Sequence, residues 1–456
     1  MKKTISALSI FILLSVELLA DTIDLEQARV LALAHSRSLA RYEMSIRNSV
    51  LDERSQLYSM LPSLSAEYSA SMSYLDRNWG LVNPADTFNA GATFSLTQII
   101  FQGGKGFIQK ALSAISTESV RKDALAEYFN VLDSVDSAYY AVLEAVASLE
   151  SSESSLQTAE LSLSIAQIRQ ASGMINQGDY LKALADKESR ESARNQARRS
   201  LALSVTRLNA LTGLSQAVDL AEVDFDAYEG MIQRLAGISD EQADALYDRF
   251  WEILVQTNPS LARAALNSQR AEKNLSMAKR DYAPTISATI FSNALNYSVA
   301  GGFSNTTNGG ISIRGSIPID FWVMANRLEK SKIARDSAML DYAGAELSLE
   351  TDLQSSLLNT IAQAESVLSS RRTLDYTEKH FEYVMERYRL SQSSVSDLGE
   401  ASSLLITARN NLIRARYGFL QSLSKLRSLG AIDDEEQLAR LLLGDDAQAD
   451  DTETSR

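Results

Sequence analysis

The chain of 456 residues carries the same landmarks twice. The tetrapeptide Ser-Leu-Ala-Arg at residues 38–41 recurs at 260–263, an offset of 222 residues. Arg169, which precedes a short polar turn, recurs as Arg387 before a second polar turn, an offset of 218 residues. A nearly constant offset between distant landmarks indicates two copies of one structural unit. The repeat therefore constrains the fold more than any single motif does.

The duplication predicts a division of the chain into five parts. A signal peptide is expected over 1–20, because Lys2 and Lys3 precede an apolar run that ends near the small residue Ala20. Leu18 is larger than the residue usual at its position, so an uncleaved anchor remains the alternative. The other expected parts are a first repeat over 21–212, a linker over 213–240, a second repeat over 241–430 and an acidic tail over 431–456.

The composition excludes several classes of protein. The chain has no cysteine, so it contains neither disulfides nor a lipid-modified N-terminal cysteine. Its formal net charge of -14 would repel phosphates, so nucleic acid is not an expected partner. After the N-terminal segment, no run of 18 apolar residues predicts a transmembrane helix. These features leave a soluble exported protein or a β-barrel membrane protein.

Each copy contains a stretch that interrupts the helical pattern. Apolar residues alternate with small polar ones over 64–74, 88–100 and 311–319, which is the period of a β-strand. The run 285–297 is less regular, because Ile290 and Phe291 fall in opposite phases, and this predicts a bulge beside them. Four strands of about ten residues are therefore expected, two in each copy.

Strands with one apolar and one small polar face are typical of a transmembrane β-barrel, although a hairpin packed on a soluble core gives the same pattern. The repetition in an exported chain favours the barrel, as do Phe101, Phe321 and Trp322, which lie where an interfacial aromatic belt belongs. The loops at 76–86 and 298–310 would then be extracellular. Four strands leave open edges, so two, three or four copies would close barrels of 8, 12 or 16 strands.

The remaining sequence predicts long helices. No proline interrupts the chain from about Lys105 to Ser172, and apolar residues recur there at steps of three, four and seven, which predicts a helix about 100 Å long. Its counterpart runs from about Ala325 to Leu390. Two shorter helices, near residues 25–60 and 179–211, together match that length and could stack end to end beside a long one. A hollow helical tube fits these lengths, and a solid coiled coil is the alternative.

Together these features resemble the TolC-type outer-membrane efflux proteins. The resemblance covers about Asp24 to Ile432 and rests on the repeated element order, the junction TQIIFQGGK and the turns RQASGMINQGDYLKA and RYRLSQSSVSDLGEA. It implies a mainly α fold with a β-barrel part. Three copies would form a 12-stranded outer-membrane β-barrel, continued by a long periplasmic α-helical barrel. Residues 213–240 and the tail after Gly430 would supply an equatorial region.

The resemblance also implies a function: a passive conduit in the outer membrane for small-molecule efflux, with type I protein secretion as the close variant. The chain has no nucleotide motif, so an inner-membrane transporter, joined through a periplasmic adaptor, would drive export. Outer-membrane lipid would surround the barrel. A periplasmic coiled-coil structural protein with soluble hairpins is the alternative from a different class.

The resemblance places a periplasmic gate at the two polar turns. The matching residues here are Asp397 and Glu400, with Asp179 at the equivalent place in the first copy, and Tyr388 matches a gate tyrosine. Acidic groups brought together around a symmetry axis would favour the binding of cations at the gate. The alternative is that Asp179 and Asp397 are helix-capping residues.

The adaptor is expected to dock on the same turns, at Gly173, Gly178, Ser391 and Ser393. Ser393 stands where the family has an arginine, so the contacts that lock the resting gate are expected to differ. Ser391 stands where the first copy has Gly173, so the first turn alone keeps the glycine expected at a left-handed helix end.

The sequence offers no catalytic or metal site. His35 and His380 stand alone on helical segments, so a metal is not expected. The glycine-rich run at 103–106 lacks the spacing and the Ser or Thr of a phosphate-binding loop, and is interpreted as a strand-to-helix junction. The chain is therefore predicted not to be an enzyme and to need no cofactor.

Overall fold

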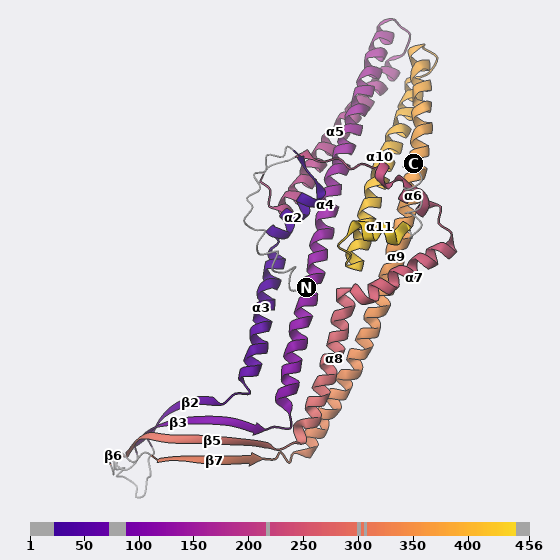
Figure 1. Cartoon of the computed structure of the whole chain (residues 1–456). Coiled ribbons are helices and arrows are strands. Elements are labelled where there is room, and N and C mark those ends of the chain that lie inside the picture. The colour runs from indigo at the N-terminus through magenta and orange to yellow at the C-terminus, as the bar shows by residue number, and fades with distance from the viewer. Residues whose placement is uncertain (1–21, 73–87, 216–218, 299–301, 305–307, 444–456) are drawn as a thin grey trace, which may run out of the picture. The chain divides into compact units, whose positions relative to one another are not determined.

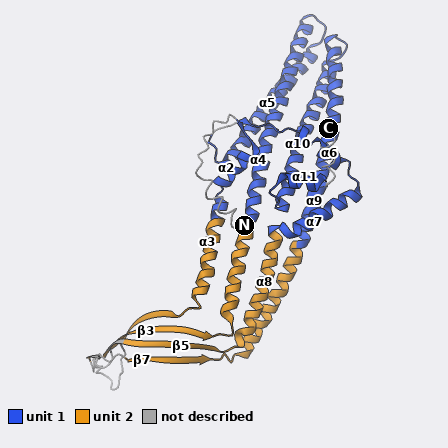
Figure 2. Ribbon diagram, in the orientation of Figure 1, with its two compact units in different colours: residues 1–41, 124–259, 346–456 blue, residues 42–123, 260–345 orange. Residues whose placement is uncertain are grey.

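The computed structural model describes residues 22–72, 88–215, 219–298, 302–304 and 308–443. The expected signal peptide and the loop at 76–86 lie outside these residues. The described chain divides into two compact units, shown in Figure 2. Unit 1 contains residues 1–41, 124–259 and 346–456, and unit 2 contains residues 42–123 and 260–345. Each unit thus draws on both copies of the repeat, whereas the expected domain boundaries, which follow the repeats, stay a prediction.

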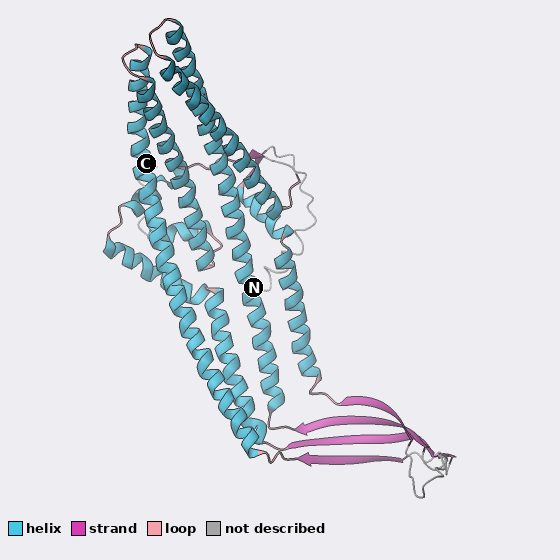
Figure 3. Ribbon diagram, turned by 180° about the vertical axis from the view of Figure 1, so that it is seen from behind, coloured by secondary structure: helices cyan, strands magenta, loops and turns pink. Residues whose placement is uncertain are grey.

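Unit 2 holds an antiparallel sheet, whose strands lie side by side in Figures 1 and 3. Strands β2 (Ser63–Met72) and β3 (Phe88–Phe101) form the hairpin of the first copy, and β5 (Thr285–Ser298) and β7 (Asn308–Ser316) form that of the second. The two hairpins join through β3 and β5. The short strand β6 (Gly302–Ser304) lies within the second expected loop and pairs with the far end of β5.

The two faces of this sheet differ, as the alternation predicts. Leu64, Leu96, Ile290 and Ile311 occupy paired positions and form an apolar row across all four long strands. The outermost two are 76% and 74% exposed, so no described residue of the chain covers the ends of the row. On the other face, polar side chains bond between strands: Ser65 with Ser95 at 2.7 Å, and Thr97 with Thr289 at 3.1 Å.

The expected bulge beside Ile290 and Phe291 is wrong in position. Both residues are paired without interruption, to β3 on one side and to β7 on the other. The register against β3 shifts instead between the pairs Ala92–Leu295 and Thr93–Asn293. Phe291 has the opposite phase because its ring lies over Gly310 on the polar face, where a Cβ would stand 3.0 Å from the ring.

The glycine-rich run at 103–106 is a strand-to-helix junction, as predicted. Gly103 and Gly104 have φ angles of 66° and 74°, a conformation that glycine adopts without strain. A Cβ on Gly103 would stand 2.5 Å from Ala283 Cβ. Arg280, which lies between α8 and β5, donates to both glycine carbonyls at 3.2 Å, so this junction is tied to the helix-to-strand junction of the second copy.

The first expected helix is two helices, which corrects the prediction. It consists of α2 (Leu25–His35) and α3 (Arg37–Tyr58), and the break lies at Ser36, whose ψ of 110° is extended. The Ser36 hydroxyl accepts from the Leu39 N–H at 3.3 Å and so caps the second helix. The second copy breaks 222 residues later at Asn258, between α7 (Asp240–Thr257) and α8 (Pro259–Lys279). The extended Asn258 precedes a proline, which disfavours helical backbone there.

The long helices are present as predicted. Helix α4 (Lys105–Ala171) has 67 residues and α9 (Phe321–Arg389) has 69. Each is followed by a turn of five residues and a helix of 36 residues, α5 (Gln177–Thr212) and α10 (Val395–Gly430). Among the described helices, none combines the length and the apolar character that a membrane span needs.

The linker and the tail contribute to unit 1. The linker holds the short strand β4 (Asp219–Leu220), which pairs in parallel with β1 (Thr22–Ile23), and the helix α6 (Glu229–Ala236). The tail forms α11 (Glu435–Leu443), which packs against α6 and α7. The 3₁₀ turns η3 (Asp226–Tyr228) and η4 (Arg280–Tyr282) complete the described elements.

A buried ionic cluster joins four helices of unit 1. Asp136 on α4 is fully buried and accepts two hydrogen bonds from Arg29 on α2, both at 2.7 Å. Ser424 donates to the same carboxylate at 2.7 Å, and Arg427 approaches it at 3.4 Å. Glu435 on α11 contacts both arginines, at 2.7 and 3.1 Å. Burial alone would lower the pKa of Arg29, but the bonds and charge of Asp136 outweigh it, and the pKa is raised.

Candidate functional site

The two polar turns lie at the ends of four helices that share one core. Buried side chains of α4, α5, α9 and α10 form this core, which consists of Ala166, Ala183, Val384, Met385, Tyr388, Val395, Leu398 and Ala401. All of these residues belong to unit 1. We call the two turns with their flanking helix ends the first tip, around residues 172–176, and the second tip, around residues 390–394.

The two turns share one backbone geometry. At the first tip, the Met174 N–H donates to the Arg169 carbonyl at 2.8 Å, and Gly173 has a φ of 71°. At the second tip, the Gln392 N–H donates to the Arg387 carbonyl at 2.8 Å, and Ser391 has a φ of 61°. Both are Schellman endings with a left-handed residue. Ser391 therefore adopts a conformation that costs a side-chain-bearing residue about 1 kcal/mol.

The helices that follow the turns are capped by different residues. Asn176 caps α5, because its side chain accepts from the Asp179 N–H at 2.9 Å. Ser394 caps α10 through a reciprocal pair: the Asp397 N–H donates to the Ser394 hydroxyl at 3.1 Å, and the Ser394 N–H donates to the Asp397 carboxylate at 2.9 Å. The first tip is thus capped by a neutral amide and the second by a charged capping box.

The hydrogen bonds of the second turn hold the Asp397 carboxylate in place. Besides the Ser394 N–H, the Ser393 hydroxyl donates to it at 3.0 Å. These bonds, that of the Ser394 backbone first, lower the pKa of Asp397. Ser393 therefore bonds within its own turn.

The other two acidic residues are less constrained. Within the described part of the chain, the carboxylates of Asp179 and Glu400 have no hydrogen-bond or ion-pair partner. Glu400 is exposed on α10, one turn beyond the capping box, and Asp179 is partly exposed in the first turn of α5. Both acids are therefore available to groups outside this chain.

Tyr388 lies inside the tip core and is fully buried. Its hydroxyl donates to the Ser162 carbonyl of α4 at 3.4 Å. The Arg169 guanidinium stacks on its ring at 4.3 Å from the centroid and donates to its backbone carbonyl. Tyr388 therefore ties the end of α9 to the end of α4.

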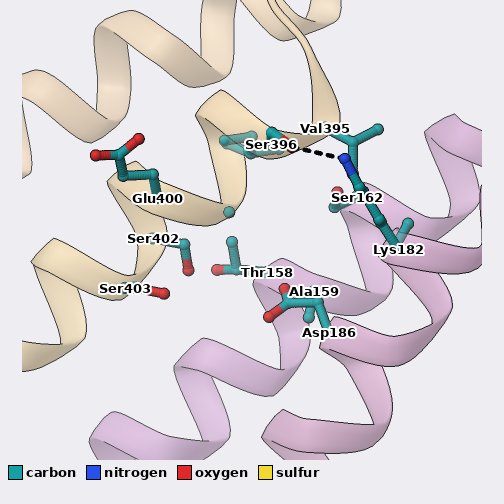
Figure 4. A pocket seen from close by; sticks show the side chains of 13 residues that line it. Thr158, Ala159, Ser162, Lys182, Asp186, Val395, Ser396, Glu400, Ser402 and Ser403 are labelled. Atoms are coloured by element: carbon teal, nitrogen blue, oxygen red, sulfur yellow. Dashed lines mark hydrogen bonds between the residues drawn. The ribbon is translucent and has the colours of Figure 1, made fainter. Parts of the chain in front are cut away.

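A pocket of about 460 Å³ lies beside the tip core, between α4, α5 and α10 (Figure 4). Lys182 and Asp186 of α5 line it, and so do Ser396 and Glu400 of α10. The Lys182 ammonium donates to the Ser396 hydroxyl at 3.2 Å, the bond drawn in Figure 4. Thr158 and Ser162 of α4 close the remaining side.

The expected docking residues lie around this core at the turns. Gly173, Gly178 and Ser391 are exposed, and Ser393 is partly exposed. A Cβ on Gly173 would meet no atom within 4 Å, whereas one on Gly178 would stand 3.1 Å from the Asn176 amide oxygen. The surface at both turns is therefore open to a partner.

Sequence reasoning missed two features of the tips. The first is the contact of Arg169 with Tyr388. The repeat marks Arg169 as the counterpart of Arg387, but it does not predict this contact. The second is Lys182, which no motif distinguishes from other exposed lysines. The described residues contain no group of three or more His, Asp or Glu side chains that could hold a metal ion.

Comparisons with known proteins agree on one family. The model of the family described as "Outer membrane efflux protein" matches residues 28–214 and 252–431. The outer membrane protein TolC of Escherichia coli is 23% identical over 410 residues, which cover 85% of this chain and 78% of that protein. The fold is similar to the Campylobacter jejuni CmeC outer membrane channel, with a TM-score of 0.73, 16% identity and coverage of 92% and 89%. It is also similar to the open Neisseria gonorrhoeae MtrE outer membrane channel, with a TM-score of 0.72, 16% identity and coverage of 89% and 88%.

Proposed function

The chain belongs to the outer membrane efflux protein family, and we propose that three copies form the outer-membrane channel of a tripartite export system. The channel is a passive conduit for small molecules from the periplasm to the outside, gated at the two tips. A periplasmic adaptor docks on the tips and joins the channel to an inner-membrane transporter, which supplies the energy.

The observation that carries this proposal is the open-edged sheet with an uncovered apolar face. The row from Leu64 to Ile311 is exposed on one face, while hydroxyl groups bond to one another on the other. Such a sheet suits lipid on one side and water on the other. Among the described strands, β2 and β7 each pair along one edge, and an unpaired edge is costly in lipid. Strands of neighbouring copies would satisfy both edges.

The helices of unit 2 support the same assembly. Met44, Leu51 and Tyr58 on α3 recur at steps of seven and are exposed. Ile333 and Leu340 on α9 recur at the same step and are exposed as well. Heptad stripes are the pattern of helices that pack along one another. In Figure 1, β2 and β7 lie at opposite edges of the sheet, and α3 and α9 lie at opposite sides of unit 2. A contact between these two sides would join one copy to the next head to tail, an arrangement that can close into a ring.

Cross-linking tests this assembly, because the chain has no native cysteine. Leu51→Cys combined with Ile333→Cys, treated with a short bis-maleimide, is expected to give a ladder that ends at a covalent trimer. The control pair is Asp52→Cys with Ile333→Cys, since position 52 is exposed but about 100° round the helix. Trimers are expected in the outer-membrane fraction. A chain found wholly in the soluble periplasm would refute the conduit.

The geometry of the second tip supports a proposal for the gate residues. We propose that Asp397 and Glu400 of three copies surround the axis and favour cations. Glu400 has no partner among the described residues, whereas Asp397 is held by its turn, so Glu400 is the more adjustable acid. Asp179 contributes from the first tip. Tyr388 acts from inside the core, because its burial leaves it no surface on the passage.

The adaptor is proposed to contact the turns at Gly173, Gly178, Ser391 and Ser393, beside the pocket. The pocket offers a cation, two carboxylates and several hydroxyl groups next to a small-residue turn, which suits a polar helix-hairpin end. Lys182→Glu is expected to abolish capture of the cognate adaptor in a pull-down. Lys187→Glu, which alters a lysine that pairs with Glu191 on the same helix, is expected to leave capture unchanged.

A further inference from the structure

Arg169 is a buried cation without an acidic partner in the described part of the chain. The residue is 7% exposed, and no carboxylate among the described residues forms an ion pair with it. Burying an isolated charge is costly, so buried charges are nearly always paired with an opposite charge. By contrast, the other buried arginines among the described residues, Arg29 and Arg427, share the carboxylates of Asp136 and Glu435.

The partners of Arg169 are an aromatic ring and a backbone carbonyl, both of Tyr388. The guanidinium lies 4.3 Å from the ring centroid, well within the range of a cation–π contact. The Tyr388 carbonyl also accepts from the Ser391 N–H at 3.0 Å, in the left-handed ending of α9. The carbonyl of Arg169 itself accepts the Met174 N–H that closes the first turn. Arg169 therefore takes part in both turn closures: its carbonyl accepts in the first turn, and its side chain donates to the carbonyl that accepts in the second.

The repeat supplies a natural comparison. Arg387 occupies the matching position, but its guanidinium donates to Gln392 of its own turn at 3.0 Å and lies 5.7 Å from the Tyr383 ring centroid of its own helix. Two arginines at one repeat position thus have different partners. Arg387 stabilises a single tip, whereas Arg169 joins two.

We propose that Arg169 is a positioning residue that clasps the two helix hairpins of one chain and so holds the acidic end of the second hairpin in place. This inference rests on the proposed function, since it assigns Arg169 a part in the gate at the tips. Separation of the hairpins removes Tyr388 from Arg169 and leaves the guanidinium without either partner. The clasp therefore makes the two hairpins of one chain move together.

Thiol labelling tests the clasp without any measurement of transport. Ala166→Cys places a thiol in the tip core, where the alanine is fully buried. In this background, Arg169→Gln and Arg169→Met are each expected to raise the rate of maleimide labelling about tenfold or more, because a desolvated cation–π contact and a charged hydrogen bond are lost. Arg387→Gln is the matched control and is expected to leave the rate unchanged.

Two further variants separate a clasp from a general structural role. Ala415→Cys places a thiol at a buried site of α10 outside the tip core, and its labelling is expected to stay slow in every background. Arg169→Lys keeps the charge and is expected to restore part of the protection at position 166. Wild-type labelling with Arg169→Met would show that the side chain only fills space. An equal rise at positions 166 and 415 would show general loosening, and either result overturns the proposal, whether or not the trimer conducts.

Discussion

The two tips have the same backbone and different chemistry. Both have a turn of five residues, a Schellman ending and a side-chain cap three residues before an aspartate. The first has glycine at the left-handed position and a neutral amide cap, while the second has Ser391 and the charged box of Ser394 with Asp397. The fold thus requires a tight turn at both places but does not require the same side chains. Because their side chains differ, the two tips can serve different functions.

The largest expected difference between the tips is in their cores. Tyr388 is fully buried, whereas Gln170 at the matching position of the first copy bonds Gln177 near the surface. Tyr388→Ala is expected to lower the local opening free energy of the tip by about 3 kcal/mol or more, because it leaves a cavity. Gln170→Ala is expected to change it by less than about 0.5 kcal/mol. Hydrogen exchange of the last turns of α9 and α4 measures the change in opening free energy for each variant. Equal changes would contradict the expected difference between the two cores.

The caps are expected to differ less. Asn176→Ala and Ser394→Ala each remove a side chain that accepts from a first-turn N–H, which costs about 1 kcal/mol. The loss is expected to be greater for Ser394, because the capping box with Asp397 is broken as well. Hydrogen exchange at the start of α10 and α5 gives the two values. A greater loss of stability for Asn176→Ala would show that the capping box of Ser394 with Asp397 adds no stability.

Substitutions at the two left-handed positions are expected to change the stability of the turns in opposite directions. Ser391→Gly should stabilise the second turn and Gly173→Ser should destabilise the first, each by about 1 kcal/mol. No atom lies within 4 Å of a Cβ on Gly173, so the backbone conformation alone sets that cost. Exchange protection of the Met174 and Gln392 amides reports the two changes. Changes of the same sign would mean that partner contacts, rather than backbone preference, decide the turn.

Of the two side-chain caps, acid is expected to weaken only that of the second tip. The lowered pKa of Asp397 means that its contribution is complete above about pH 3.9, the value for a free aspartate, and is lost as the pH falls through the lower folded value. Asn176 does not titrate, so its cap persists. Rate-corrected hydrogen exchange at pH 6 and pH 3 should therefore show fraying at the start of α10 but not of α5. Fraying at the starts of both α10 and α5 would contradict a specific effect of Asp397 protonation.

Local patterns made much of this fold predictable. The strands, the long helices and the turns follow from alternation, heptad spacing and repeated turn residues, which are all short-range features. The break at Ser36 was missed because serine does not by itself end a helix, whereas its counterpart is marked by Pro259. The bulge was misplaced because the phase of Phe291 reflects its packing on Gly310, a cross-strand contact.

Long-range contacts explain what the sequence did not reveal. Arg29 and Asp136 are 107 residues apart, and Arg169 and Tyr388 are 219 apart, so no local pattern joins them. The position of Asp136 in the sequence does indicate that it is buried, since it lies one turn from Leu132 and Tyr140 on an otherwise apolar helix face. An acid in that position predicts a buried basic partner but does not identify it. The gate and docking residues stay a prediction, because the partners proposed for them belong to other chains.

Single-channel recording in planar bilayers tests the gate most directly. The wild-type channel is expected to be cation-selective and to be blocked by trivalent cations. Asp397→Asn with Glu400→Gln is expected to weaken that block about tenfold or more, because charges of three copies are lost around one axis. Asp179→Asn is expected to weaken it less. A block that is unchanged in the double variant would contradict the gate and leave Asp397 as a helix cap.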